Sequence, residues 1–202
     1  MTHSEDFLRQ MCKKKVVGEF PPFSEKHIFN KSHIKATEEY IKQIVGRVKD
    51  NHKIVVESDF NNLGSGFASY ILVKISKRDK SATIISKKGN VVIEETKGIV
   101  LYISKLSPYW YYGAGNWSVS HINGKWHSAS EGFLRPESLE SFNNDAWGQE
   151  MDIIKSIFEM YRYRLLTQEE VKQELWFEVE IPTLLSESLY YQVFDCFFFW
   201  ED

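Results

Sequence analysis

The chain lacks most of the sequence features that mark a particular chemistry. Its 202 residues include only two cysteines, and its apolar runs, such as Phe197–Trp200, are far short of the roughly 20 residues that cross a bilayer. We find no nucleophile elbow, no metal-ligand spacing and no complete phosphate or calcium loop. The first 15 residues contain no apolar run of the kind that a signal peptide needs. These absences predict no enzyme activity, no metal, no cofactor and no membrane segment, and they favour a cytoplasmic protein.

The scarcity of cysteine points to the same compartment. Cys12 and Cys196 lie near opposite ends of the chain. Two thiols can form one disulfide but no disulfide framework, and free thiols in a cytosolic chain are the simpler interpretation. Because Cys196 is flanked by Phe194 and Phe197, we expect it to be a small buried hydrophobic residue.

The bulk composition predicts one folded domain. Hydrophobic residues make up 43% of the chain and aromatic residues 15%, which is too apolar for a disordered protein. A chain of this length can bury a core of its own. We expect one domain over residues 1–202, with an irregular segment at 1–30, a helix and antiparallel strands at 32–130, and a helix and C-terminal strands at 131–202.

Charge is divided along the chain. Residues 1–130 contain 20 Lys and Arg against 12 Asp and Glu, whereas residues 131–202 contain 5 against 16. The formal net charge of −3 therefore conceals a basic first part and an acidic last part. Electric fields of this kind steer association and disfavour wrong partners, so the division predicts a charged partner.

The periodicity of apolar residues predicts an α+β fold, an antiparallel sheet of hairpins flanked by an N-terminal helix and a longer C-terminal helix. An apolar stripe over Ile34–Val48 indicates the first helix, with Ser32 as its N-cap. Short alternating runs within Phe67–Ala129 indicate the strands. Turns are expected at Lys88–Asn90, Lys97–Gly98 and Asn123–Gly124, and the longest loop at Lys105–Gly115.

The last third of the chain predicts a helix followed by two strands. Apolar residues at helical spacing favour a helix over roughly 146–164. Thr167 and Glu170 match a capping box and should begin a short helix. We expect strands at Trp176–Ile181 and Tyr190–Trp200, both rich in aromatic or β-branched residues.

Three possible chemical sites have incomplete patterns. His121 and His127 are expected on opposite faces of one hairpin, where they cannot share an ion unless the register shifts. The segment Asp59–Gly66 resembles a fragment of a phosphate or calcium loop, but it lacks the remaining ligands of either, so we expect a strand connection. A hydrolase that uses Glu57 and Asp59 at a strand end stays open as an alternative function.

The segment Tyr109–Trp117 begins with four consecutive aromatic residues. Side chains alternate along a strand, so half of such a run should face solvent or a loop, unless the loop folds over the sheet and buries it. Exposed Tyr and Trp anchor proteins, carbohydrates or bases. We therefore take Tyr109, Trp110 and Tyr111 as candidate partner-binding residues, with a nucleic-acid or carbohydrate module as an alternative. Because arginine is scarce among the nearby basic residues, nucleic acid is not expected as the partner.

The acidic residues of the last third form the main candidate site. Clustered glutamates are often only a solvated face, but 16 acidic residues between positions 131 and 202 are concentrated enough to attract a basic partner. The candidate partner-binding carboxylates are Glu169, Glu170, Glu174, Glu178, Glu180, Glu187, Glu201 and Asp202.

The C-terminal pattern resembles a known family. It contains Leu165-Leu166-Thr167 followed by Glu169-Glu170, then Trp176-Phe177, then the aromatic run Val193–Asp202. This pattern is similar to the tails of small immunity proteins of bacterial polymorphic toxin systems. The resemblance implies a compact α+β domain that binds and blocks a cognate toxin, often a nuclease. The hypothesis is therefore a non-catalytic binding protein whose acidic surface covers the basic site of a protein partner.

Overall fold

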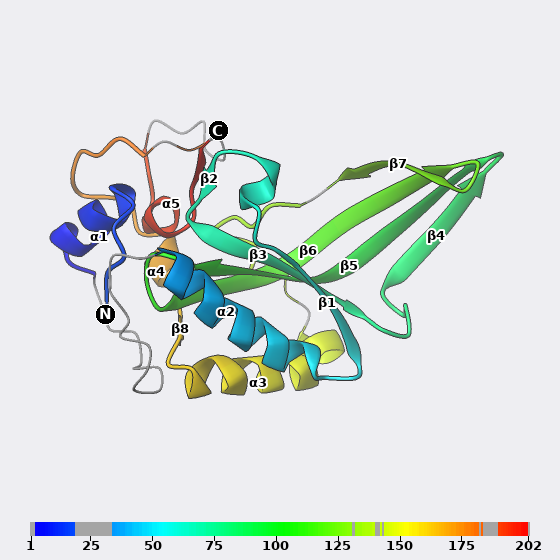
Figure 1. The fold of residues 1–202 in the computed structure, drawn as a ribbon, viewed down its shortest axis with the longest axis horizontal. Helices are drawn as coiled ribbons and strands as arrows, with labels where there is room; N and C mark the ends of the chain where they lie inside the picture. Colours follow the sequence, from blue (N-terminus) through cyan, green and yellow to red (C-terminus); the bar gives the residue numbers. More distant parts are fainter. Residues whose placement is uncertain are drawn as a thin grey trace.

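The computed structural model places a mostly antiparallel sheet between two groups of helices (Figure 1). It describes residues 3–18, 34–130, 132–139, 142, 144–181, 183 and 190–201. The predicted α+β class, with an N-terminal and a longer C-terminal helix beside the sheet, is confirmed. The expected N-cap Ser32 lies outside the described residues. None of the described helices is long and apolar enough to span a bilayer.

The main sheet has seven strands, and β1, β3, β5, β6 and β7 follow one another across it. Strand β4 pairs antiparallel with β5, whereas the short β8 runs parallel to the start of β6. Strands β2 (Phe67–Ala68) and β9 (Trp200–Glu201) form a separate antiparallel pair. The strands of the main sheet are β1 Ile54–Asp59, β3 Tyr70–Lys77, β4 Thr83–Lys88, β5 Val91–Ser104, β6 Tyr109–Ile122, β7 Lys125–Ser130 and β8 Arg164–Leu165.

The two longest strands pass through two different environments. Strands β5 and β6 have 14 residues each, and their halves Ile99–Ser104 and Tyr109–Ala114 lie between helices in the body of the protein. Their other halves, Val91–Thr96 and Trp117–Ile122, pair with β4 and β7 and project away from the helices (Figure 1). We call residues 83–96 and 117–130 the β-arm.

The turn expected at Lys97–Gly98 and the loop expected at Lys105–Gly115 are both wrong. Lys97 pairs with Asn116 and Gly98 pairs with Gly115, so the ladder between β5 and β6 continues without a break. A Cβ atom on Gly98 would collide with the ring of Trp117, so glycine permits the close contact that keeps the strands paired. The turn at Asn123–Gly124 is confirmed, since φ is 52° at the first residue and 73° at the second.

Helices α2 (Ile34–Lys49) and α3 (Asn144–Met160) cover one face of the sheet in the body (Figure 1). The stripe predicted for the first helix is buried as expected, for example at Ile41 and Ile44. The predicted helix over 146–164 ends at Met160 instead, because the chain turns at Arg162, where φ is 55°. The apolar residues of this layer include Ile71, Val73, Ile75, Ile99, Leu101, Ile103, Trp110, Ile154 and Phe158.

The other face of the sheet is covered by helices α1 (Glu5–Cys12) and α5 (Val193–Phe197), together with the chain around the short helix α4 (Gln168–Val171). The irregular segment expected at 1–30 therefore contains a helix, which begins at the N-cap Ser4 and buries Leu8. The strand expected over Tyr190–Trp200 is also wrong, because a capping box between Gln192 and Asp195 begins a helix there. Only its last part pairs as a strand, in β9.

Candidate functional site

An extended segment after α4, residues 174–181, carries the most distinctive exposed surface in the acidic part of the chain. Its inward side chains Leu175, Phe177 and Val179 pack against the core, and Ile181 is buried. Its outward side chains Glu174, Trp176, Glu178 and Glu180 are all exposed. We call residues 174–181 the acidic strip. The strand expected over Trp176–Ile181 is wrong: the side chains alternate as in a strand, but the segment joins the rest of the described chain by one isolated bridge, Glu174 to Gln192, and by no ladder.

Contacts from two other segments hold the acidic strip in place. The Leu175 N–H donates to the Tyr191 carbonyl at 3.0 Å, next to the bridge. From α1, the Arg9 guanidinium donates to the Glu178 carbonyl at 2.9 Å and lies 4.5 Å from the centre of the Phe177 ring. These contacts fix the backbone of the strip and leave its carboxylates directed to solvent.

A hollow of about 490 Å³ runs beside the strip. The segment Glu174–Val179 lines one side of it, and Tyr190 and Tyr191 line the other. Trp176 is 49% exposed and Tyr190 is 74% exposed, which is unusual for aromatic side chains of this size. Aromatic groups beside a hollow provide the apolar centre that protein interfaces use, and the glutamates provide a charged rim.

The structure divides the predicted carboxylates into two groups. Glu169, Glu174, Glu178 and Glu180 are exposed and form no ion pair with any of the described residues. Glu170 and Glu201 are instead engaged by Arg164 and Lys14, so they are structural and not free to meet a partner. Glu187 and Asp202 lie outside the described residues.

Hydrogen bonds from Arg164 and Thr167 stabilise the ionised carboxylate of Glu170. Its carboxylate accepts two hydrogen bonds from the Arg164 guanidinium, at 2.8 and 3.2 Å. It also closes the predicted capping box, since it accepts from the Thr167 N–H at 2.9 Å. Burial opposes ionisation, but these donors outweigh it and lower the pKa of Glu170. Glu170 thereby fixes the start of α4, directly before the strip.

The aromatic candidates Tyr109, Trp110 and Tyr111 do not form a binding surface. Trp110 is 1% exposed and stacks on Phe158 of α3 with ring centres 4.1 Å apart. Tyr111 is fully buried on the opposite face, where its hydroxyl donates to the Pro136 carbonyl at 2.7 Å. Tyr109 is half-buried against Phe197. The expectation of exposure is wrong because β6 lies between two helical layers here, so both of its faces are covered.

The β-arm is the exposed feature that sequence reasoning missed. Its apolar side chains Ile84, Ile85 and Trp126 are 58%, 56% and 66% exposed, and Figure 1 shows no helix over either of its faces. One signal was available in the sequence. Serines occupy alternate positions in both strands of the β6–β7 hairpin, and they pair across it, Ser118 with Ser130 and Ser120 with Ser128, at 2.8 Å each. A row of small polar residues is typical of a solvated face.

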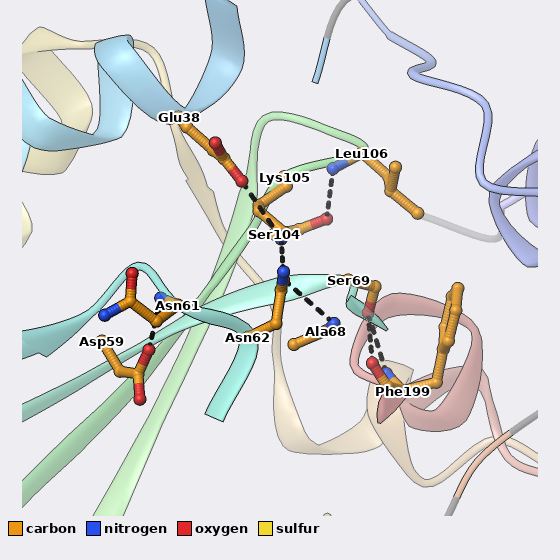
Figure 2. Close-up of polar contacts among 10 residues, drawn as sticks. All are labelled: Glu38, Asp59, Asn61, Asn62, Ala68, Ser69, Ser104, Lys105, Leu106 and Phe199. Carbon is orange, nitrogen blue, oxygen red and sulfur yellow. Dashed lines mark hydrogen bonds and ion pairs between the residues drawn. The ribbon is translucent and has the colours of Figure 1, made fainter. Parts of the chain in front are cut away.

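The loop that joins β1 to β3 serves a structural purpose. Figure 2 shows Lys105, whose side chain is 1% exposed, between Glu38 of α2 and Asn62 of this loop. Its Nζ donates to Glu38 Oε1 at 3.2 Å and to Asn62 Oδ1 at 2.7 Å. Burial lowers the pKa of Lys105, and the nearby carboxylates of Glu38 and Asp59 oppose that effect. The prediction that Asp59–Gly66 is a strand connection is confirmed, and the structure adds that Asn62 of this segment accepts a hydrogen bond from a buried lysine.

The carboxylates proposed for a hydrolase are engaged in local contacts. Glu57 pairs with Lys74 across the β1–β3 ladder at 3.5 Å, and Asp59 accepts from the Asn61 N–H at 2.6 Å (Figure 2). Both line a small hollow of about 230 Å³ that contains no histidine or cysteine. This arrangement has no activated nucleophile or general base pair, so it gives the hydrolase alternative no support.

The histidine pair also fails to form a metal site in the described structure. A β-bulge shifts the register between Ser120 and His121, so that Ser120 pairs with Ser128 and His127 is the extra residue. Even so, no three His, Cys, Asp or Glu side chains among the described residues come together as metal ligands. Comparison of the chain with protein-family models, curated proteins and solved structures found no match.

Proposed function

We propose that this chain is a non-catalytic binding protein of the immunity type, which neutralises a basic protein partner by docking the acidic strip against it. The single observation that carries the proposal is the segment 174–181, where three exposed glutamates, which form no ion pair with any described residue, surround an exposed tryptophan. The resemblance of the C-terminal pattern to immunity proteins points the same way. The partner would be a toxin domain in the cytoplasm of the same cell.

The chemistry of the strip favours a basic partner. Because Glu174, Glu178 and Glu180 have no ion pair among the described residues, a docking lysine or arginine would displace only water. Their combined field would accelerate encounter with a positive surface and repel acidic proteins. A nuclease is a fitting class of partner, because a surface that holds phosphates is itself basic.

The contacts that order the strip from its inner side favour specific binding. Its inward side chains are packed into the core, and Arg9 and Tyr191 hold its backbone. A surface that is already ordered loses less conformational entropy when a partner docks, so more of the interaction energy appears as affinity. Trp176 and Tyr190 beside the hollow would supply the apolar contacts that dominate most interfaces.

The test is growth rescue by co-expression with the product of the gene beside its own. The wild-type chain is expected to restore growth to cells that express that neighbour and to co-purify with it. The variant Glu174→Lys, Glu178→Lys, Glu180→Lys is expected to lose both properties, because it reverses the charge of the strip.

A matched variant separates the strip from net charge. Glu95→Lys, Asp152→Lys, Glu159→Lys changes the same number of exposed carboxylates on the β-arm and α3, and it is expected to retain rescue. Absence of both rescue and complex formation for the wild-type chain would remove the proposal. Equal loss in the two triple variants would remove the strip from it.

A further inference from the structure

The two cysteines, which are 184 residues apart in the sequence, meet in the folded chain. Cys12 is the last residue of α1 and Cys196 lies in α5, and their Sγ atoms are 3.5 Å apart. Both side chains are buried, although Cys12 retains 8% exposure and Cys196 none. A disulfide needs two Cβ atoms about 3.8 Å apart and an S–S bond of about 2.05 Å. The two Sγ atoms would have to approach each other by about 1.5 Å to reach that bond length.

We propose that Cys12 and Cys196 form a thiol–disulfide site that a peroxide oxidises, and that the resulting bond clamps α1 to α5. The pair is reduced in a cytoplasm at rest, where disulfides are typically transient and redox-sensing. The two helices already pack face to face in the core that contains Leu8, Met11 and Phe197. The cross-link therefore joins elements that need no rearrangement to meet.

The environment assigns different roles to the two thiols. A hydrogen bond from the Cys196 thiol stabilises the Cys12 thiolate and lowers the pKa of Cys12, although burial opposes it. The same contact, together with burial, raises the pKa of Cys196. Cys12 is also the more exposed of the two. Cys12 is therefore the thiol that meets the oxidant, and Cys196 is the resolving thiol.

The reaction balances with a peroxide as the only oxidant. The Cys12 thiolate attacks one oxygen of hydrogen peroxide, the O–O bond breaks, and sulfenic acid and hydroxide form. The Cys196 sulfur then attacks the Cys12 sulfur, the S–O bond breaks, and the hydroxyl leaves as water with the Cys196 proton. The hydroxide takes up the proton that Cys12 released on ionisation. Two thiols and one peroxide thus give one disulfide and two waters.

The clamp would act on the acidic strip through α1. Arg9 contacts the strip at the Glu178 carbonyl and at the Phe177 ring. Lys14, just beyond Cys12, pairs with Glu201 of the C-terminal strand β9. Fixing the end of α1 to α5 would hold both contacts in place. This consequence for partner affinity rests on the proposed function, whereas the cross-link itself does not.

The experiment is peroxide titration of the purified chain. One equivalent of hydrogen peroxide is expected to lower the intact mass by about 2 Da and to join the Cys12 and Cys196 peptides in a non-reducing digest. The midpoint of thermal unfolding should rise by roughly 10 °C, because a disulfide across so long a loop strongly restricts the unfolded chain. Dithiothreitol should reverse both changes.

Cys12→Ser and Cys196→Ser serve as paired controls, and each is expected to abolish the mass loss and the rise in the midpoint. If either variant fails to fold, the peptide map of the wild-type chain decides the matter alone. Sulfinic or sulfonic acid at Cys12 without a cross-link, or a disulfide between two molecules, would overturn the proposal. These results are independent of whether any partner binds, so failure of the proposed function would leave them unchanged.

Discussion

The acidic strip and the β-arm are both exposed and extended, and each carries one exposed tryptophan, but different forces support them. Every second side chain of residues 174–181 packs into the core, and the backbone makes few hydrogen bonds. The strands of the β-arm are fully paired with one another, and no described helix covers either face (Figure 1). The strip is therefore held by side-chain burial, whereas the arm is held by strand pairing.

Charge separates the two regions further. The strip contains three glutamates within seven residues, whereas the edge strands of the arm carry Lys87, Lys88 and Lys125. Lysine on an open strand edge hinders the addition of further strands. The difference teaches that exposure alone does not identify a docking surface. The strip combines glutamates that form no ion pair with the described part of the chain and a backbone held by core packing, whereas the arm combines exposure with lysines that hinder aggregation.

The largest expected effect contrasts one isoleucine from each region. Ile181→Ala removes a side chain that is 2% exposed, and it should lower the free energy of unfolding by about 2–4 kcal/mol. Ile85→Ala on the arm removes one that is 56% exposed, and it should change that free energy by less than about 0.5 kcal/mol. Urea unfolding measures both, and equal losses would mean that the arm is buried in solution.

A smaller effect is expected from one ion pair next to each region. Glu170→Gln breaks the bidentate contact with Arg164 and weakens the capping box, so it should destabilise the protein by about 1–2 kcal/mol at pH 7. Lys80→Met, in the turn before β4, removes a solvent-exposed pair with Glu94 of the arm and should cost less than about 0.5 kcal/mol.

The loss in Glu170→Gln should depend on pH. Because the folded pKa of Glu170 is lowered, its stabilisation is complete above the ordinary value of 4.5 and disappears as the pH falls through the folded value. Unfolding curves of wild type and variant at pH 7 and in acid should therefore converge in acid. A difference that stays constant over this range would show that the carboxylate charge contributes nothing.

The smallest expected effect concerns the contact between α1 and the strip. Arg9→Ala removes the hydrogen bond to Glu178 and the stacking on Phe177, and it should cost about 0.5–1 kcal/mol. Hydrogen exchange should accelerate in residues 174–181, while the amides of the β-arm stay unchanged. Unchanged exchange in the strip would show that α1 does not order it.

Features set by local chemistry could be predicted from the sequence. The Asn123–Gly124 turn and the Thr167–Glu170 capping box depend only on adjacent residues, and both are present. The strand expected over Trp176–Ile181 is extended and its side chains alternate between core and solvent, but it pairs with no other strand among the described residues. Its failure to form a ladder could not be predicted, since pairing depends on which other strand lies alongside.

Features set by distant contacts could not be predicted. The Lys97–Gly98 pair resembles a turn, and only the fold, which brings the Trp117 ring against Gly98, shows why a glycine stands in a continuous strand. Glu201 looked free until the fold brought Lys14 beside it. Trp110 and Tyr111 looked half exposed because alternation along a strand does not reveal that helices cover both faces of the sheet.

The most direct measurement is the dissociation constant between the purified chain and the product of the neighbouring gene, by isothermal titration calorimetry. We predict that Glu174→Lys, Glu178→Lys, Glu180→Lys weakens binding at least about 100-fold, as expected when several interfacial charges are reversed. The matched variant Glu95→Lys, Asp152→Lys, Glu159→Lys should stay within about threefold of wild type. Equal weakening by the two variants, or unchanged binding by the first, would contradict the account.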